Sequence, residues 1–180
     1  MSDPRARARD AALAVLLNLG VVLDAVVTAL RALWNLGALA GAKRAADALG
    51  VPVPDHTHVV ERLAELPIAD GVAHALLFEV ADRIASSVTT PSDAGTTERA
   101  VSSAIQRRAK LLAQTEQAKA AHLAAMEVYR ANHVQRLHWV GGQCKRCQAN
   151  AAASPIGMND HWPDGSPPVH PGCHCWTIPA

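Results

Sequence analysis

Four cysteines and a histidine near the C-terminus have the residue types and the spacing of metal ligands. Cys144 and Cys147 are separated by two residues, and so are His170 and Cys173. Zinc prefers thiolate and imidazole ligands in tetrahedral geometry, and a Cys-x-x-Cys pair places two sulfurs on one tight turn. A structural site needs a second such pair from elsewhere in the chain. The sequence therefore predicts a structural zinc module that extends from Cys144 to Cys175.

This segment offers more ligands than one zinc ion takes. Our first choice is the set Cys144, Cys147, His170 and Cys173. The four cysteines together are a close second set, in which His170 would hydrogen-bond a thiolate instead of binding the metal. Cys175 and the neighbouring His174 are further candidates.

Disulfides and redox chemistry are the other interpretations of these cysteines. Disulfides are rare in a reducing cytoplasm. A redox-active Cys144-x-x-Cys147 pair would leave Cys173 and Cys175 unexplained. The sequence has no Gly-x-Ser-x-Gly, phosphate-loop or His-Glu-x-x-His motif. Asp160-His161 is interpreted as a loop hydrogen bond rather than a hydrolytic base, so we predict no enzymatic activity.

The elements that must position these ligands are predicted to be mostly helical. Periodicity and capping residues predict helices over residues 11–49, 55–66, 71–88 and 98–133. The first has Gly37 and Gly41 as points where it can break, and a run of alternating Val and Pro ends it. Thr96 or Thr97 is expected to cap the last and longest helix, after a linker that ends at Gly95.

A small C-terminal module is predicted to follow the long helix. Val134–Val140 alternates apolar and polar residues, which is typical of a strand, and Gly141-Gly142 turns the chain into the first cysteine pair. Prolines and glycines between the ligand pairs predict a loop with little regular structure. Three tryptophans are expected to supply the apolar surface of this module: Trp139, Trp162 and Trp176. The predicted division is a helical N-terminal region (1–95), one long helix (96–133) and a zinc-stapled module (134–180).

Composition limits the partners. Hydrophobic residues make up 49% of the chain, much of it alanine, which predicts helices packed closely through small side chains. A net charge of +1 gives no strong electrostatic case for binding nucleic acid, and the basic cluster Arg107, Arg108 and Lys110 is interpreted as a solvated face. The apolar run Ala11–Leu23 follows three arginines, but it is too short to span a bilayer, so we expect no membrane contact.

A series of motifs resembles the phage Mu F-like family of minor head proteins, which are also called head-morphogenesis proteins. The matching residues are Ala113-Gln114-Thr115-Glu116, Trp139, Cys144, Cys147, Asn150-Ala151, Ser154-Pro155-Ile156, Pro163-Asp164-Gly165, Pro167-Pro168 and His170 to Cys175. The resemblance is specific from Ala113 to Cys175. Gln114 and His174 stand where the family usually has Arg, and neither change disturbs the Cys and His set.

The resemblance implies a structural protein of a tailed phage head rather than an enzyme. Such a protein would assemble inside the capsid near the portal vertex, in the cytoplasm of a bacterial host. Its partners would be the portal protein, the major capsid protein or both, with several copies in each head, and contact with packaged DNA stays open. The alternatives are a zinc-dependent nuclease, a thiol oxidoreductase and a nucleic-acid-binding zinc ribbon.

The first helix is expected to contact another chain. Large apolar residues between Ala11 and Leu36 cover more than one helical face, and Asp24 and Arg31 are the only charges after Asp10. A helix on the surface of a single domain usually has one apolar stripe opposite a charged face. The remaining apolar surface therefore predicts a partner, which is another copy or a head protein.

Overall fold

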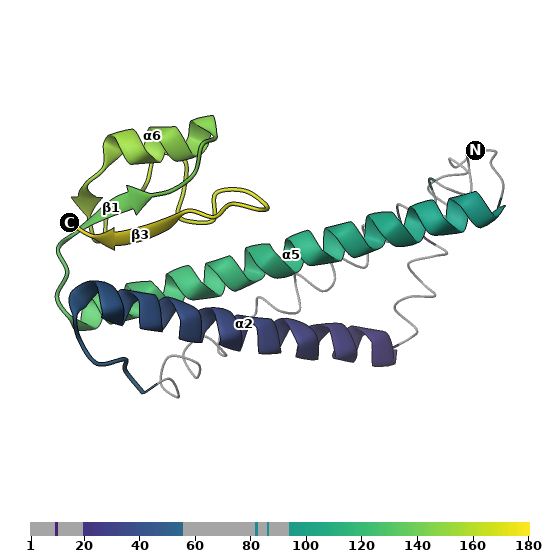
Figure 1. The fold of residues 1–180 in the computed structure, drawn as a ribbon, viewed down its shortest axis with the longest axis horizontal. Coiled ribbons are helices and arrows are strands. Elements are labelled where there is room, and N and C mark those ends of the chain that lie inside the picture. The colour runs from purple at the N-terminus through teal and green to yellow at the C-terminus, as the bar shows by residue number, and fades with distance from the viewer. Residues whose placement is uncertain (1–9, 11–19, 56–81, 83–85, 87–93) are drawn as a thin grey trace. The chain divides into compact units, whose positions relative to one another are not determined.

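Small residues build most of the helical part of this protein. The computed structural model describes residues 10, 20–55, 82, 86 and 94–180 (Figure 1). Its elements are α2 (Gly20–Leu49), α5 (Ala94–Ala131), β1 (Arg136–Val140), α6 (Lys145–Ala153), β2 (Ile156–Gly157) and β3 (Trp176–Pro179). The mostly α prediction is confirmed for these residues. The helices expected at 55–66 and 71–88 lie outside them, apart from Asp55, which is not helical, and Asp82 and Ser86, which are.

The chain divides into two compact units, and neither is continuous in sequence. The first comprises Met1–Arg31 and Pro67–Lys110, and the second comprises Ala32–Leu66 and Leu111–Ala180. Every predicted metal ligand belongs to the second unit, which is described below. The predicted boundaries at residues 95 and 133 stay a prediction.

Helix α2 passes unbroken through Gly37 and Gly41, the two glycines at which the sequence left a break open. Gly37 and Gly41 are buried, and a Cβ on either would overlap the backbone carbonyl of Gln117 or Ala121 on α5. The glycines let the two helices approach closely, and burial against α5 offsets their low helix propensity. The surrounding buried positions are also small, namely Ala38, Ala42, Ala45, Ala46, Ala120 and Ala124. Packing through small side chains is therefore confirmed.

Helix α5 begins earlier than predicted and ends in a well-formed cap. It starts at Ala94, so Thr96 and Thr97 lie within the helix rather than before it, and the predicted linker to Gly95 ends too late. At the other end His133 adopts a positive φ of 55°, His133 N donates to Arg130 O at 3.1 Å and Val134 N donates to Tyr129 O at 3.0 Å. These two bonds form a Schellman motif, which ends the helix and turns the chain into β1.

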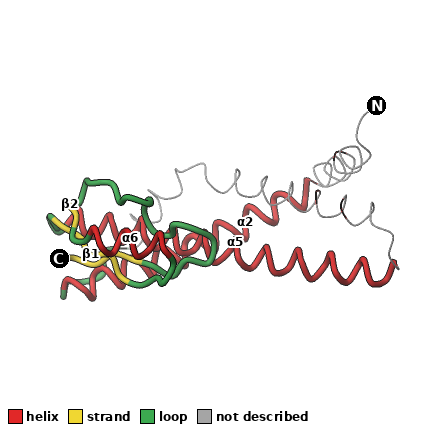
Figure 2. Tube along the Cα trace, turned by 90° about the horizontal axis from the view of Figure 1, so that it is seen from above, coloured by secondary structure: helices red, strands yellow, loops and turns green. Residues whose placement is uncertain are grey.

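The predicted strand is confirmed as β1, the central strand of a three-stranded antiparallel sheet. The strand order is β2-β1-β3 (strands in yellow in Figure 2). Trp139 lies opposite Thr177, and Leu137 lies opposite Ile156 on one side and Pro179 on the other. Leu137 and Trp139 are buried, whereas Arg136, the first residue of the strand, is exposed. Tyr129 at the end of α5 donates its hydroxyl hydrogen to Thr177 O at 3.0 Å, which joins the sheet to the long helix.

The segment between the two ligand pairs is more regular than predicted. It contains most of α6 and all of β2, so the expectation of a loop with little regular structure was wrong for residues 148–153 and 156–157. Asn150 on α6 is fully buried; its side chain accepts from Asp164 N and donates to Gly165 O, both at 2.9 Å. This asparagine holds the loop that follows β2 against α6, so the remaining irregular segment is fixed in place.

Two of the three tryptophans form the apolar centre of the module. The rings of Trp139 and Trp162 meet edge to face with centroids 5.0 Å apart, and both are buried. Trp176 instead lies partly exposed, with the guanidinium of Arg44 5.3 Å from its ring centroid. The expected packing role therefore holds for Trp139 and Trp162, and Trp176 contacts a cation on α2.

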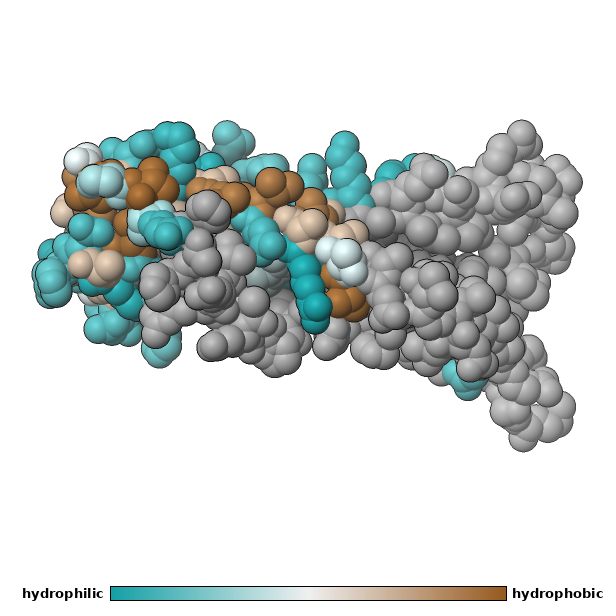
Figure 3. All heavy atoms as spheres, turned by 90° about the horizontal axis from the view of Figure 1, so that it is seen from below, coloured by the Kyte–Doolittle hydropathy of each residue, from teal (hydrophilic) through white to brown (hydrophobic). Residues whose placement is uncertain are grey.

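Hydrophobic side chains also reach the surface. On α2, Leu36 is 57% exposed and Leu39 is 37% exposed. Figure 3 shows one face of the molecule, on which hydrophobic residues, coloured brown, form a band. Leu36 is the last residue of the segment expected to contact a partner; most of that segment lies outside the described side chains. No helix among the described residues is long and apolar enough to cross a membrane.

The close contact between α2 and α5 predicts that Gly41→Val lowers the free energy of unfolding by about 2 kcal/mol, because the new side chain meets the Ala121 backbone. The matched control is Ala48→Val on the exposed side of α2, with an expected loss of about 0.6 kcal/mol. Chemical denaturation followed by circular dichroism measures both values. If helix propensity alone acted, Ala48→Val would be the more destabilising change, since it replaces the best helix former, whereas Gly41→Val replaces a poor one. That result would contradict the close packing.

Candidate metal centre

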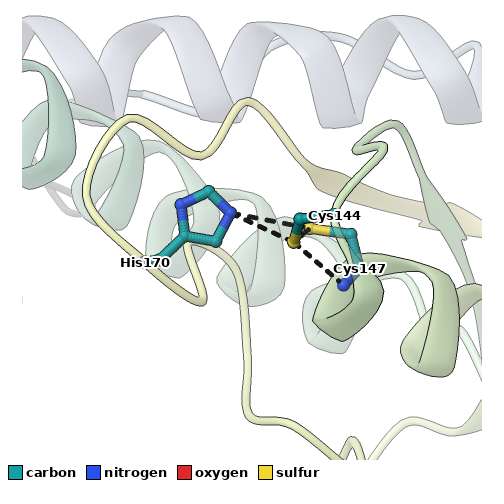
Figure 4. Close-up of side chains that lie close together, drawn as sticks. All are labelled: Cys144, Cys147 and His170. Atoms are coloured by element: carbon teal, nitrogen blue, oxygen red, sulfur yellow. Dashed lines mark hydrogen bonds between the residues drawn. The ribbon is translucent and has the colours of Figure 1, made fainter.

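The first two ligands lie where β1 gives way to α6. Gly141 and Gly142 adopt positive φ angles of 83° and 81°, which glycine tolerates best, and they turn the chain from the strand into the helix. Cys144 is the N-cap of α6, and its sulfur accepts a hydrogen bond from Cys147 N at 3.4 Å. One helical turn therefore points both sulfurs toward the same place (Figure 4).

The other ligands come from the loop before β3. Cys173 N donates to His170 O at 3.1 Å, and Gly172 has a φ of 73°, so the chain folds back tightly between the two ligands. The loop is anchored to α5 because Gly172 N donates to Thr115 Oγ1 at 3.3 Å. That hydroxyl donates in turn to Leu111 O at 2.7 Å. The long helix therefore supports the second ligand segment.

His170 presents the nitrogen that a metal needs. Its Nδ1 lies 3.0 Å from Pro171 O, which can only accept, so the proton is assigned to Nδ1. Nε2 then carries the free lone pair, 3.3 Å from the sulfur of Cys144 and 3.9 Å from that of Cys147 (Figure 4). A carbonyl that fixes the tautomer in this way is the usual support of a metal-binding imidazole.

Five predicted ligands form one cluster, which can hold a metal ion. The ligand atoms of Cys144, Cys147 and His170 lie within 4.8 Å of one another, and so do those of Cys147, Cys173 and Cys175. Cys147 belongs to both groups and is almost fully buried. His174 is exposed and belongs to neither group. Both the first-choice set and the four-cysteine set are compatible with these two groups.

The sulfur distances fit thiolates around a metal better than disulfides. All four cysteines are free. The Cys147–Cys173 sulfur distance is 3.9 Å, close to the ~3.8 Å edge of a tetrahedron with Zn–S bonds of ~2.3 Å. Three further pairs, Cys144–Cys147, Cys173–Cys175 and Cys147–Cys175, have sulfurs 3.0 to 3.2 Å apart, which exceeds the ~2.05 Å of a disulfide by far. The four-cysteine set requires all three pairs to open by less than about 1 Å, whereas the first-choice set requires this of Cys144–Cys147 alone.

The surroundings of the thiols give them different acidities. The backbone N–H of Cys147, followed by its side chain, lowers the pKa of Cys144 to about 7. Burial raises the pKa of Cys147, and it raises that of Cys175 to about 11. The Pro171 carbonyl raises the pKa of His170. Without a cation the thiols of Cys147 and Cys175 keep their protons, and a bound metal would displace these protons because only the thiolate is a strong ligand.

Sequence reasoning missed three residues that shape this cluster. A Cβ on Gly142 would lie 2.5 Å from the Cys175 sulfur and 2.6 Å from that of Cys147, so no other residue fits between them. Thr115 anchors the second ligand loop, and Asn150 braces α6. Gly142 lies in the predicted Gly-Gly turn, and Thr115 and Asn150 lie in motifs that carry the family resemblance. No spacing rule connects these three residues to the metal ligands.

The predicted role of Asp160 is confirmed and excludes it from the cluster. Its Oδ2 accepts from Gly157 N at 2.8 Å, which closes the turn after β2. Neither Asp160 nor His161 belongs to a group of potential ligands in the part of the chain that the structure describes. The carboxylate therefore acts as a loop hydrogen bond.

Thiol acidity predicts the order of alkylation in metal-free protein. Cys144 should react first with iodoacetamide at pH 7.5 and Cys147 last, because lowering a thiol pKa to about 7 makes it mostly thiolate at that pH. The rate at Cys144 should rise up to about pH 8 and then level off, because a thiol with a pKa of about 7 is almost fully ionised there. The rate at an ordinary thiol, which titrates near 8.5, would still be rising at that pH. Peptide mass spectrometry at timed points measures the order. A sample of Cys144→Ser controls for the fast phase, and equal rates at all four cysteines would contradict the prediction.

Comparisons with protein-family models, with curated proteins and with solved structures give no match to this chain. The geometry of the cluster and the motifs that surround it therefore carry the functional assignment.

Proposed function

We propose that this chain is a structural protein of a tailed phage head whose C-terminal module is held together by one zinc ion. The observation that carries the proposal is the meeting of five thiol and imidazole ligand atoms in one cluster. These ligands also belong to two of the motifs by which the chain resembles the Mu F-like minor head proteins, the Cys144-x-x-Cys147 pair and the run from His170 to Cys175. Metal chemistry and resemblance thus depend on the same residues but are separate arguments.

The chemistry of the donors favours zinc and a structural role. Soft thiolate ligands with an imidazole suit zinc in tetrahedral coordination, whereas magnesium and calcium take oxygen ligands. Two groups that share Cys147 provide more than four donors. A metal whose positions are all filled by protein has no open site for water or substrate, which argues against hydrolytic catalysis.

A metal at this site would cross-link the two ends of the module. Cys144 and Cys147 follow β1, and His170 lies 26 residues beyond Cys144, before β3. Closing that loop limits the unfolded chain in the way a disulfide does. The module has few large apolar residues beyond Leu137, Trp139 and Trp162, so it needs such a constraint.

Thiol–disulfide exchange is the second candidate function. Cys144 opens a helix after a strand, its pKa is lowered to about 7, and its sulfur lies 3.2 Å from that of Cys147. Those are features of redox-active pairs. The sulfurs of Cys175 and Cys173 lie only 3.1 and 3.9 Å from Cys147, however, and a redox pair gives them no purpose. A metal explains all four.

The assembly partners are proposed from the resemblance and from the exposed side of α2. We infer that the portal or the major capsid protein, or another copy of this chain, covers Leu36 and Leu39 inside the head. Both side chains are exposed in this structure. Burying a large aliphatic side chain contributes roughly 1.5–3 kcal/mol, so a few such contacts hold an assembly.

Protein purified without added metal should contain about one zinc per chain, measured by elemental analysis. Cys147→Ser should lose the metal and make residues 134–180 sensitive to protease, because Cys147 belongs to both ligand groups and metal binding stabilises folding. His174→Ala is the control, since it lies between two ligands but outside both groups, and it should keep its zinc. Metal retained by His170→Ala but lost from Cys175→Ser would identify the four-cysteine set. Zinc-free wild-type protein would contradict the proposal.

Mass spectrometry of purified virions should find this chain in the head. The double variant Leu36→Ser and Leu39→Ser should fold but enter heads at least tenfold less often, because the lost burial is worth about 3 kcal/mol or more. Val53→Ser removes another exposed apolar side chain and serves as the control. Absence of the wild-type chain from virions would refute the head assignment and leave the metal site unaffected.

A further inference from the structure

The sulfur of Cys175 lies in a buried niche beside α6. The sulfurs of Cys173 and Cys147 lie 3.0 and 3.1 Å from it, and a Cβ on Gly142 would lie 2.5 Å from it. Cys175 itself is 7% exposed, and all three members of its ligand group are buried. Water therefore has little access to this sulfur, so groups of the protein must decide its position and its charge.

The indole ring of Trp139 lies beside this niche. Trp139 pairs on the sheet with Thr177, two residues beyond Cys175, so β1 and β3 place it close to the ligand loop. Edge-to-face packing against Trp162 fixes the ring, and both rings are 6% exposed. Burial raises the pKa of Cys175 to about 11, and the N–H of Trp139 opposes this rise because it stabilises the thiolate. The sulfur of Cys175 is therefore an acceptor within reach of this N–H.

The indole N–H of Trp139 is buried and has no oxygen or nitrogen acceptor. It is the only polar group of the side chain, and a buried donor without an acceptor destabilises a fold. A neutral thiol accepts weakly, whereas an acceptor that carries negative charge forms hydrogen bonds roughly twice as strong. A metal bound to Cys175 would make the sulfur such an acceptor, because the metal binds the thiolate. Metal binding would thus supply the partner that Trp139 lacks.

We propose that Trp139 is a positioning residue of the metal centre, whose indole N–H donates to the metal-bound thiolate of Cys175. Hydrogen bonds from neighbouring groups orient the ligands of a metal and tune their affinity for it. This one makes Cys175 a ligand of the ion and so favours the four-cysteine set, in which His170 hydrogen-bonds a thiolate instead. The inference rests on the proposed zinc site and deepens it, because it names a residue that selects among the five candidate ligands.

Nuclear magnetic resonance of the full-length protein loaded with a magnetically active isotope of cadmium tests the hydrogen bond directly. Cadmium is a soft ion and binds at thiolate sites in place of zinc. Scalar coupling joins the cadmium nucleus to the β protons of each cysteine that binds it. Coupling through an N–H···S hydrogen bond joins it to the donated proton as well. We expect cadmium correlations with the β protons of Cys175 and with the indole proton of Trp139.

A matched pair of variants separates the N–H from the packing of the ring. Trp139→Phe keeps an aromatic ring without the N–H, and it should weaken zinc binding by about tenfold or more, the usual effect of losing a hydrogen bond to a metal ligand. The control is Trp162→Phe, which shortens the other ring of the same edge-to-face pair. It loses similar apolar contact and should bind zinc nearly as tightly as the wild type does. Competition with a chelating dye measures the three affinities.

Equal zinc affinities of Trp139→Phe and Trp162→Phe would overturn the proposal. So would a cadmium spectrum of the wild type without a correlation to the indole proton, and that spectrum decides even if Trp139→Phe does not fold. Correlations with the β protons of Cys144 and Cys147 but not with those of Cys175 would refute this inference and leave the metal site intact. A chain that binds neither cadmium nor zinc would overturn the metal proposal together with this inference.

Discussion

The mutual approach of four thiols and one imidazole is the constraint on which the module depends. Thiolates repel one another, and buried thiols are held neutral here by raised pKa values at Cys147 and Cys175. The chain nevertheless collects these groups from two segments 26 residues apart, around a sulfur that is 1% exposed. Apolar packing of two tryptophans explains where the strands lie but not why the sulfurs converge. A cation that neutralises thiolates explains the convergence.

The close packing of α2 against α5 supports the cluster of thiols and imidazole. The glycines of α2 bring its backbone against α5, and α5 in turn holds the ligand loop through Thr115 and the sheet through Tyr129. Larger residues at the glycine positions would separate the helices. The metal site therefore shares the long helix with this packing.

The sequence supplied the local parts of this structure and missed the parts set by distant contacts. Cysteine and histidine spacing identified all five members of the cluster, and alternation identified β1. Helix α2 runs through Gly37 and Gly41 because α5 buries them. Local helix propensity could not predict this contact, because α5 is distant in sequence. Helix α6 was missed because Pro and Gly follow it closely, although Ala151, Ala152 and Ala153 favour a helix. The choice among ligand sets needs the three-dimensional positions of Cys175 and His170, which spacing alone does not give.

The position of Cys144 as the N-cap of α6 connects coordination to the start of a helix. A helix of nine residues is too short to form by itself in water, since fixing the first turn costs more than its single hydrogen bond returns. The sulfur that accepts from Cys147 N fixes that first turn, and a metal bound to both sulfurs would hold it in place. The ion would then act as a nucleus for α6, so that folding of this end of the chain follows the supply of metal in the cell.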